Sequence, residues 1–134
     1  MDKCDKIIET VLGKNGNNRN EKNIEIFKNY LLAHLKLPVR VTGIEDFPWE
    51  ERYVFGYGSQ KEYANMKKDN PSYADEFDLL DIKDTARSDD LIGKIKRISD
   101  RKVFDFELSW LKAVDEKSNA FDLLNAYAIW HTNY

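Results

Sequence analysis

The chain has 134 residues, with 21 basic and 24 acidic side chains and a formal net charge of -3 at pH 7. Its length is typical of one domain, so we expect residues 1–134 to form a single domain. The charges are spread along the chain without a basic stripe, which argues against nucleic acid as a partner. Neither an apolar signal segment nor a membrane-spanning apolar run is present, so we expect a cytoplasmic protein that does not enter a membrane. Cys4 is the single cysteine, which excludes an internal disulfide.

The first third of the chain predicts two helices. A short one begins near Asp5 and ends at Gly13, with apolar residues at helical spacing between them. The asparagine-rich stretch 14–20 is expected to be a connecting loop. A longer helix begins at an Asn20 cap and stops before Pro38, which disfavours helix at the residue before it. The apolar stripe of this helix consists of Ile24, Phe27, Leu31 and Leu35.

The middle of the chain predicts short strands. Residues 39–41 alternate in polarity, and Gly43 ends that strand. Residues 52–58 are aromatic and β-branched, which predicts a strand, and a capping box then predicts a short helix over residues 59–68. Residues 76–82 change their apolar face halfway, so we expect a twisted or bulged strand there.

The last third predicts a hairpin and a closing helix. Residues 90–108 contain two strands around a turn at 99–102, because the side chains alternate between apolar and polar after the turn. Residues 118–130 carry apolar side chains at helical spacing, and either Ser118 or Asn119 is expected to cap this helix. Short strands flanked by helices predict an α+β domain with a small curved antiparallel sheet or an SH3-like β-barrel at its core.

The carboxylates are the most suggestive candidates for chemistry. They gather in groups with few lysines between them, and the stretch from Asp81 to Asp90 is the best of these groups. Calcium takes about six to eight oxygen ligands from carboxylates, carbonyls and water, so acidic residues on neighbouring loops suit it. The pattern of an EF-hand loop is absent. A solvated acidic face that aids solubility is the alternative explanation of the same residues.

The residues give no pattern typical of an enzyme. His34 and His131 have no cysteine or carboxylate at metal-ligand spacing, and no nucleophile elbow, phosphate loop or zinc-protease motif is present. The segment 56–59, Gly-Tyr-Gly-Ser, lacks the third glycine of a dinucleotide-binding loop. We therefore expect a protein that is not an enzyme.

Two parts of the chain carry a family resemblance. Residues 30–43 run from a helix through an apolar residue and proline directly into a strand. Residues 89–95 form an acidic-apolar-glycine strand, and residues 123–133 form a closing helix with tyrosine and tryptophan three positions apart. These segments resemble the small CcbP-type calcium-binding proteins of cyanobacteria and other bacteria. The resemblance covers residues 22–43 and 76–133.

The resemblance implies a β-barrel-like core with flanking helices that binds calcium through surface carboxylates, as a buffer or signalling protein. Asp89 and Asp90 fall on the acidic loop of that family. Together with the acidic stretch, they make the first ligand candidates Asp81, Asp84, Asp89 and Asp90. The second group of candidates is Glu45 and Asp46.

Residues 44–74 form an insert between the two matching parts, and they support an alternative function. The insert is rich in aromatic residues and carries an acidic excess, which suits a metal-free interaction module such as an immunity or adaptor protein that binds a basic partner. Burial of the same aromatic residues in a core is the simpler explanation. The aromatic residues proposed for this contact surface are Trp49, Tyr53, Tyr57 and Tyr63.

Overall fold

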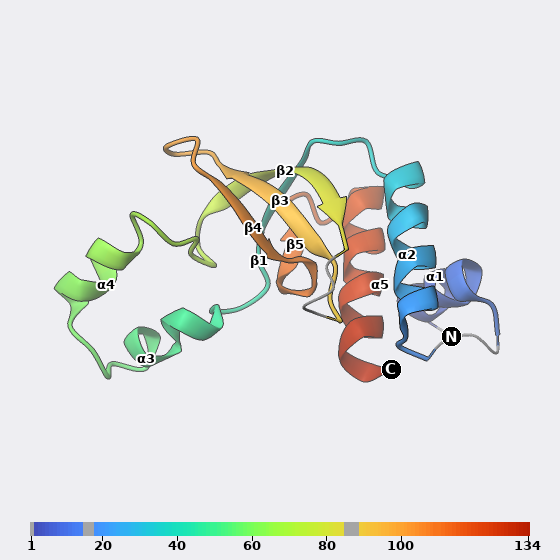
Figure 1. Ribbon diagram of the computed structural model, residues 1–134, viewed down its shortest axis with the longest axis horizontal. Helices are drawn as coiled ribbons and strands as arrows, with labels where there is room; N and C mark the ends of the chain where they lie inside the picture. The colour runs from blue at the N-terminus through green and yellow to red at the C-terminus, as the bar shows by residue number, and fades with distance from the viewer. Residues whose placement is uncertain (1, 15–17, 85–88) are drawn as a thin grey trace.

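A computed structural model describes residues 2–14, 18–84 and 89–134 (Figure 1). Its five strands form one antiparallel sheet in the order β4-β3-β2-β1-β5, and β4 and β5 are the two edges of this open sheet. The α+β class and the small antiparallel sheet are confirmed, although the sheet does not close into a barrel. The strands are β1 (Val39–Gly43), β2 (Glu76–Lys83), β3 (Ile92–Arg97), β4 (Val103–Glu107) and β5 (Leu111–Ala113).

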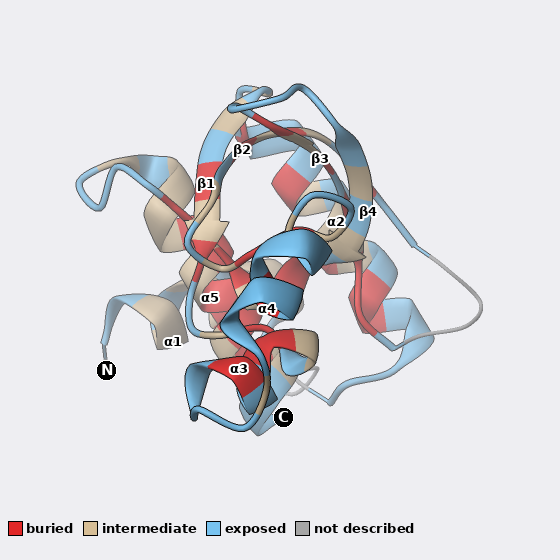
Figure 2. Ribbon diagram, turned by 90° about the vertical axis from the view of Figure 1, so that its left-hand side faces the viewer, coloured by how far each residue is buried: buried red, intermediate tan, exposed pale blue. Residues whose placement is uncertain are grey.

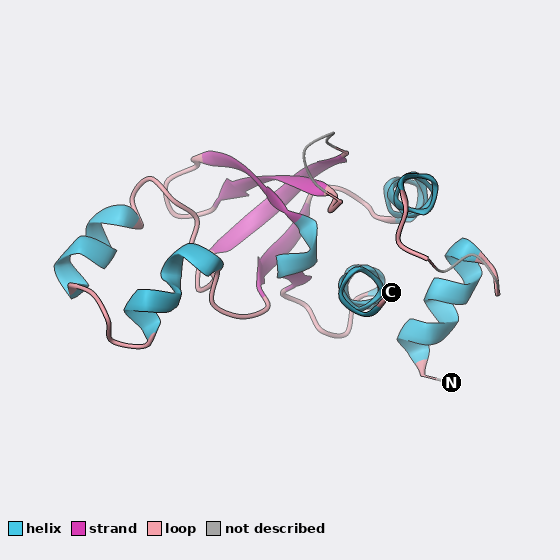
Figure 3. Ribbon diagram, turned by 60° about the horizontal axis from the view of Figure 1, so that its bottom comes forward, coloured by secondary structure: helices cyan, strands magenta, loops and turns pink. Residues whose placement is uncertain are grey.

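Three helices gather beside the sheet: α1 (Lys3–Leu12), α2 (Glu21–His34) and α5 (Asn119–Asn133). α5 contacts β5 directly, and α1 and α2 pack on α5 (Figures 1 and 3). The side chain of Asn20 caps α2 as predicted, and Ser118, one of the two predicted candidates, caps α5. Each side chain accepts a backbone N–H of the first turn. The cap of α1 is Asp2 rather than a residue near Asp5, and Gly13 ends this helix with a φ of 81°.

The core lies between the sheet and the helices, where the buried residues gather in Figure 2. Its centre is aromatic: the ring of Phe27 lies 5.3 Å from that of Tyr127 and 5.2 Å from that of Trp130, measured between centroids. All three side chains are fully buried. The C-terminal half of α5 is therefore held firmly against α2.

The sheet has one irregularity that the sequence predicted. The register of β2 against β3 shifts between Leu79 and Asp81, which is the bulge indicated by the change of apolar face. The hairpin of β3 and β4 is also confirmed, with Arg101 at a positive φ of 64° in its turn. β5 was not predicted, because a strand of three residues shows no alternation that a sequence pattern can detect.

The segment between β1 and β2 forms an arm that projects from the sheet, on the side opposite α1 and α2 (Figure 1). It contains η1 (Pro48–Glu50), α3 (Glu51–Val54) and α4 (Gln60–Met66). The prediction of a strand over residues 52–58 is wrong, because this segment begins within helix α3. Among the described residues, no strand lies beside this segment to pair with it. One helical turn instead stacks the ring of Tyr53 on that of Tyr63, with 5.0 Å between centroids.

A buried arginine holds the base of the arm to the sheet. Arg97 at the end of β3 is only 4% exposed. Its guanidinium donates hydrogen bonds to the carbonyls of Lys67, Lys68 and Asn70, which follow α4. The same group pairs with Asp100 at 2.8 Å. These contacts satisfy carbonyls at the C-terminal end of α4 and fix the position of the arm.

Candidate functional site

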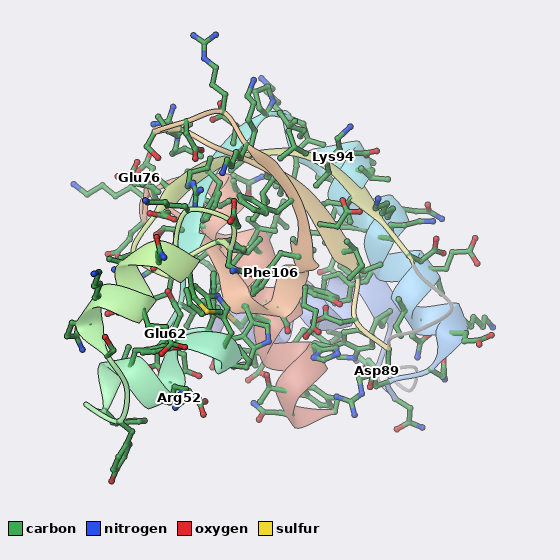
Figure 4. The ribbon with its side chains drawn as sticks, turned by 60° about the vertical axis from the view of Figure 1, so that its left-hand side comes forward. Arg52, Glu62, Glu76, Asp89, Lys94 and Phe106 are labelled. Carbon is green, nitrogen blue, oxygen red and sulfur yellow. The ribbon has the colours of Figure 1, made fainter. Side chains whose placement is uncertain are left out.

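Asp81 lies on β2 directly after the bulge and is exposed. It is paired in register with Lys94 of β3, which Figure 4 shows on the sheet. One carboxylate oxygen of Asp81 accepts the neighbouring N–H of Ile82 at 2.9 Å. Opposite charges across two strands stabilise a solvent-facing sheet surface, so the geometry of Asp81 is that of such a pair.

Asp84 and Asp89 stand on either side of residues 85–88, which lie outside the described part of the chain. The carboxylate of Asp84 is 3.3 Å from the ammonium of Lys28, and that of Asp89 is 3.3 Å from the guanidinium of Arg19. Asp89 also lies 3.5 Å from Nε2 of His131. The side chains of Asp84 and Asp89 are 59% and 60% exposed, so these ion pairs are weak and the carboxylates are accessible to a competing cation.

Asp90 differs sharply from its neighbour Asp89, because it is only 2% exposed. The hydroxyl of Tyr127 donates to Asp90 at 2.6 Å, and that of Ser109 donates at 2.5 Å. Burial and the charge of Asp90 together raise the pKa of Tyr127 far above its usual range. The phenol oxygen in turn accepts the backbone N–H of Leu91 at 2.8 Å. Asp90 thus ties the entry to β3 to helix α5, and its oxygens already accept strong hydrogen bonds.

Glu45 and Asp46 lie apart from this loop, on the connection from β1 to η1. Glu45 is exposed and Asp46 is half-buried. In residues 2–14, 18–84 and 89–134, no three histidine, cysteine or acidic side chains come close enough together to hold a metal ion. The six predicted ligands therefore stand in separate places, and the described residues do not bring them into one preformed cluster.

A groove of about 460 Å³ opens where the arm meets the body of the protein. Its walls come from the start of the arm, the segment after β4 and the C-terminal half of α5. Figure 4 shows Asp89 beside the helices, on the other side of the view from Arg52 and Glu62 of the arm. Among the residues that line the groove are Ile44, Glu45, Glu107, Trp110, Ile129 and His131.

Sequence reasoning missed a second buried carboxylate, Glu50. It is fully buried and accepts the backbone N–H groups of Phe47 at 3.2 Å and Tyr73 at 3.1 Å, and the hydroxyl of Tyr63 at 3.2 Å. Burial, followed by the charge of Glu50, raises the pKa of Tyr63 to about 12. The only sequence signal is a glutamate between aromatic residues, so its structural role in the arm emerges only from the fold.

The proposed aromatic contact surface is divided in the structure. Tyr53 and Tyr63 are buried, and the indole N–H of Trp49 donates to the carbonyl of Pro71 at 2.8 Å. Only Tyr57 of the four predicted residues is exposed, together with Phe55, at 76% and 68%. Most of the aromatic residues thus form the interior of the arm, and two remain on its tip.

Comparison with known proteins gives a likeness of fold. No family model matches the chain, and no curated protein matches it. The structure is similar to the crystal structure of Anabaena CcbP, with a TM-score of 0.60 and 14% sequence identity over 96% of this chain and 88% of that chain. The likeness spans nearly the whole of both chains, and at this identity it shows a shared fold. Within the described residues, none of the helices is long and apolar enough to cross a membrane.

Proposed function

We propose that this protein binds calcium through the exposed carboxylates of the connection from β2 to β3, as a non-EF-hand buffer or signalling protein rather than an enzyme. The observation that carries the proposal is the likeness of fold to CcbP over nearly the whole chain. The sequence resemblance to the calcium-binding proteins of that type points in the same direction. Asp84 and Asp89 are the leading ligands, because both are exposed and lie on either side of the same short segment.

The structure supports a mechanism in which calcium competes with surface ion pairs. A bound ion would draw Asp84 away from Lys28 and Asp89 away from Arg19, and each exposed pair contributes only about 0 to 1 kcal/mol. Carbonyl groups and water would complete a shell of about six to eight oxygens. Asp81 is a further ligand candidate, and Asp90 would hold the start of β3 in place from inside the fold.

The test is a calorimetric calcium titration of the chelator-stripped protein, with magnesium as the control ion. We expect saturable binding that magnesium does not reproduce, and a stabilisation of about 2.7 kcal/mol at a calcium concentration of 100 times Kd. In Asp84→Asn with Asp89→Asn, affinity should fall at least about tenfold, because two charged oxygen ligands are lost. The matched control is Asp69→Asn with Asp105→Asn, which removes two exposed carboxylates paired with lysines elsewhere.

Two results would end the calcium proposal. The first is a protein that shows neither heat of binding nor thermal stabilisation at millimolar calcium. The second is a control variant that loses as much affinity as the loop variant, since binding would then depend on net charge alone.

A second candidate is a metal-free interaction module, and the exposed tip of the arm favours it. Phe55 and Tyr57 are the two most exposed large apolar side chains of the described residues, and aromatic residues of this kind frequently carry the energy of protein contacts. The arm that bears them is fixed to the sheet by Arg97, so they are presented without a large ordering cost. If the protein does not bind calcium, the interaction module becomes the leading candidate function.

A further inference from the structure

The groove at the base of the arm has walls that the fold holds in fixed positions. The backbone N–H of Ile44 donates to the carbonyl of Trp110 at 2.9 Å, which joins two of the walls. The indole ring of Trp110 also packs edge-on against Phe47, with 6.4 Å between centroids. The third wall is α5, whose neighbouring residue Trp130 is fully buried in the core. The groove therefore needs little rearrangement to accept a ligand.

The charge of the groove is negative and uncompensated. Glu45 and Glu107 both line it, both are exposed, and neither forms an ion pair with another residue that the structure describes. His131 is the basic residue among those that line the groove, and its Nε2 lies 3.5 Å from Asp89. The groove also follows the C-terminal turns of α5, where the helix dipole carries partial negative charge. A cationic group is the complement of these features.

The remaining lining of the groove is apolar. Trp110 is half-buried and Ile44 is exposed, and both line the groove together with Ala128 and Ile129 of α5. A hydrated metal ion gains nothing from such a surface. An arginine does, because its guanidinium stacks on aromatic rings and bonds carboxylates in a planar fork, while its methylene groups cover apolar surface.

The length of the groove suits a segment of polypeptide. The groove runs along α5 from Asn125 to Asn133, which is about 12 Å at the helical rise per residue. An extended chain covers that distance with about four residues. We propose that this groove docks an extended segment of a partner protein, in which arginine side chains reach Glu45 and Glu107 and the residues between them lie on Trp110 and Ile129.

This proposal stands apart from calcium binding at Asp84 and Asp89, because none of its contacts involves those residues. Glu45 is the one residue that the groove shares with the predicted calcium ligands. The experiment is therefore performed in the presence of a chelator. Binding of a peptide there and binding of calcium in the earlier titration can then fail or succeed separately.

The test is an NMR titration of the full ¹⁵N-labelled chain with the peptide acetyl-Leu-Arg-Leu-Arg-amide. A second peptide with citrulline in place of each arginine keeps the shape and removes the charge. We expect saturable shifts of the Trp110 indole and the Ile129 amide, with a Kd of about 1 mM or tighter, and at least tenfold weaker binding of the citrulline peptide.

Two variants with the same net charge separate a specific site from general attraction. Glu45→Gln with Glu107→Gln should weaken binding of the arginine peptide by about tenfold, because the paired carboxylates are removed. Glu51→Gln with Glu116→Gln removes two exposed carboxylates outside the groove and should leave the affinity unchanged. All four side chains are exposed, so far-UV circular dichroism should show both variants folded.

Three results would overturn the proposal. One is the absence of saturable shifts at the groove up to about 5 mM peptide. Another is equal binding of the arginine and citrulline peptides, which would show that Glu45 and Glu107 do not recognise a cation. The last is equal weakening in the groove variant and the control variant.

Discussion

Removal of the phenol oxygen of Tyr127 tests how much the hydrogen bonds around Asp90 contribute to the free energy of unfolding. In Tyr127→Phe the ring packing is kept, but Asp90 loses the hydrogen bond at 2.6 Å and the N–H of Leu91 loses its acceptor at 2.8 Å. A hydrogen bond to a charged group contributes about 1.5 to 3 kcal/mol, and a buried N–H without a partner costs about 1 to 3 kcal/mol. Since Ser109 still donates to Asp90, we expect a total loss of about 3 to 5 kcal/mol.

The assay is urea denaturation, with thermal unfolding as a second measure. A loss of this size corresponds to a fall in Tm of about 10 to 15 °C for a chain of this length, and to a large part of a typical stability of about 5 to 15 kcal/mol. The matched control is Tyr57→Phe, because the same oxygen is removed from a side chain that is 76% exposed. A loss below about 1 kcal/mol in Tyr127→Phe would refute the reasoning, as would full additivity of its effect with that of Asp90→Asn.

Two further predictions concern the pH dependence of stability. The hydrogen bonds from Arg97 hold the pKa of Asp100 down at about 2, so this stabilisation is present above pH 3.8 and is lost as the pH falls towards 2. Asp100→Asn should flatten that acid limb in urea denaturation at a series of pH values, and an unchanged slope would contradict the pairing. Burial and Glu50 raise the pKa of Tyr63 to about 12, so stability is present below pH 10 and is lost between pH 10 and 12. Tyr63→Phe should remove this alkaline loss, and a variant that keeps it would disprove the assignment.

Local chemistry explains why several helix ends were predictable. The Asn20 cap and Gly13 act within one turn of the helix they delimit, so the sequence contains the whole interaction. The bulge in β2 was predictable for the same reason, because the apolar side chains change from one face of the strand to the other within consecutive residues. The strand prediction for residues 52–58 was wrong because the stacking of Tyr53 on Tyr63, an interaction between two separate helices, overrode the β propensity of the segment.

The environments of the candidate ligands could not be predicted from the sequence. Asp89 and Asp90 are adjacent and chemically identical in the sequence, yet one is exposed and the other is buried beneath Tyr127. That difference arises from a residue on a helix far along the chain, which no local pattern can reveal. The same holds for Glu50 and Arg97, whose partners are backbone groups brought near by the arm.

Under the calcium proposal, the opposite environments of these two aspartates divide binding and stability between adjacent residues. A cation site requires an accessible carboxylate on a backbone that does not have to be ordered at the moment of binding. Asp89 provides the accessible charge, and Asp90 anchors the adjacent backbone through Tyr127 and Ser109. A variant that changes both residues together would combine loss of the proposed ligand Asp89 with loss of the anchor Asp90. The two roles are therefore tested by single replacements of Asp89 and Asp90, with calcium affinity and the free energy of unfolding measured separately for each variant.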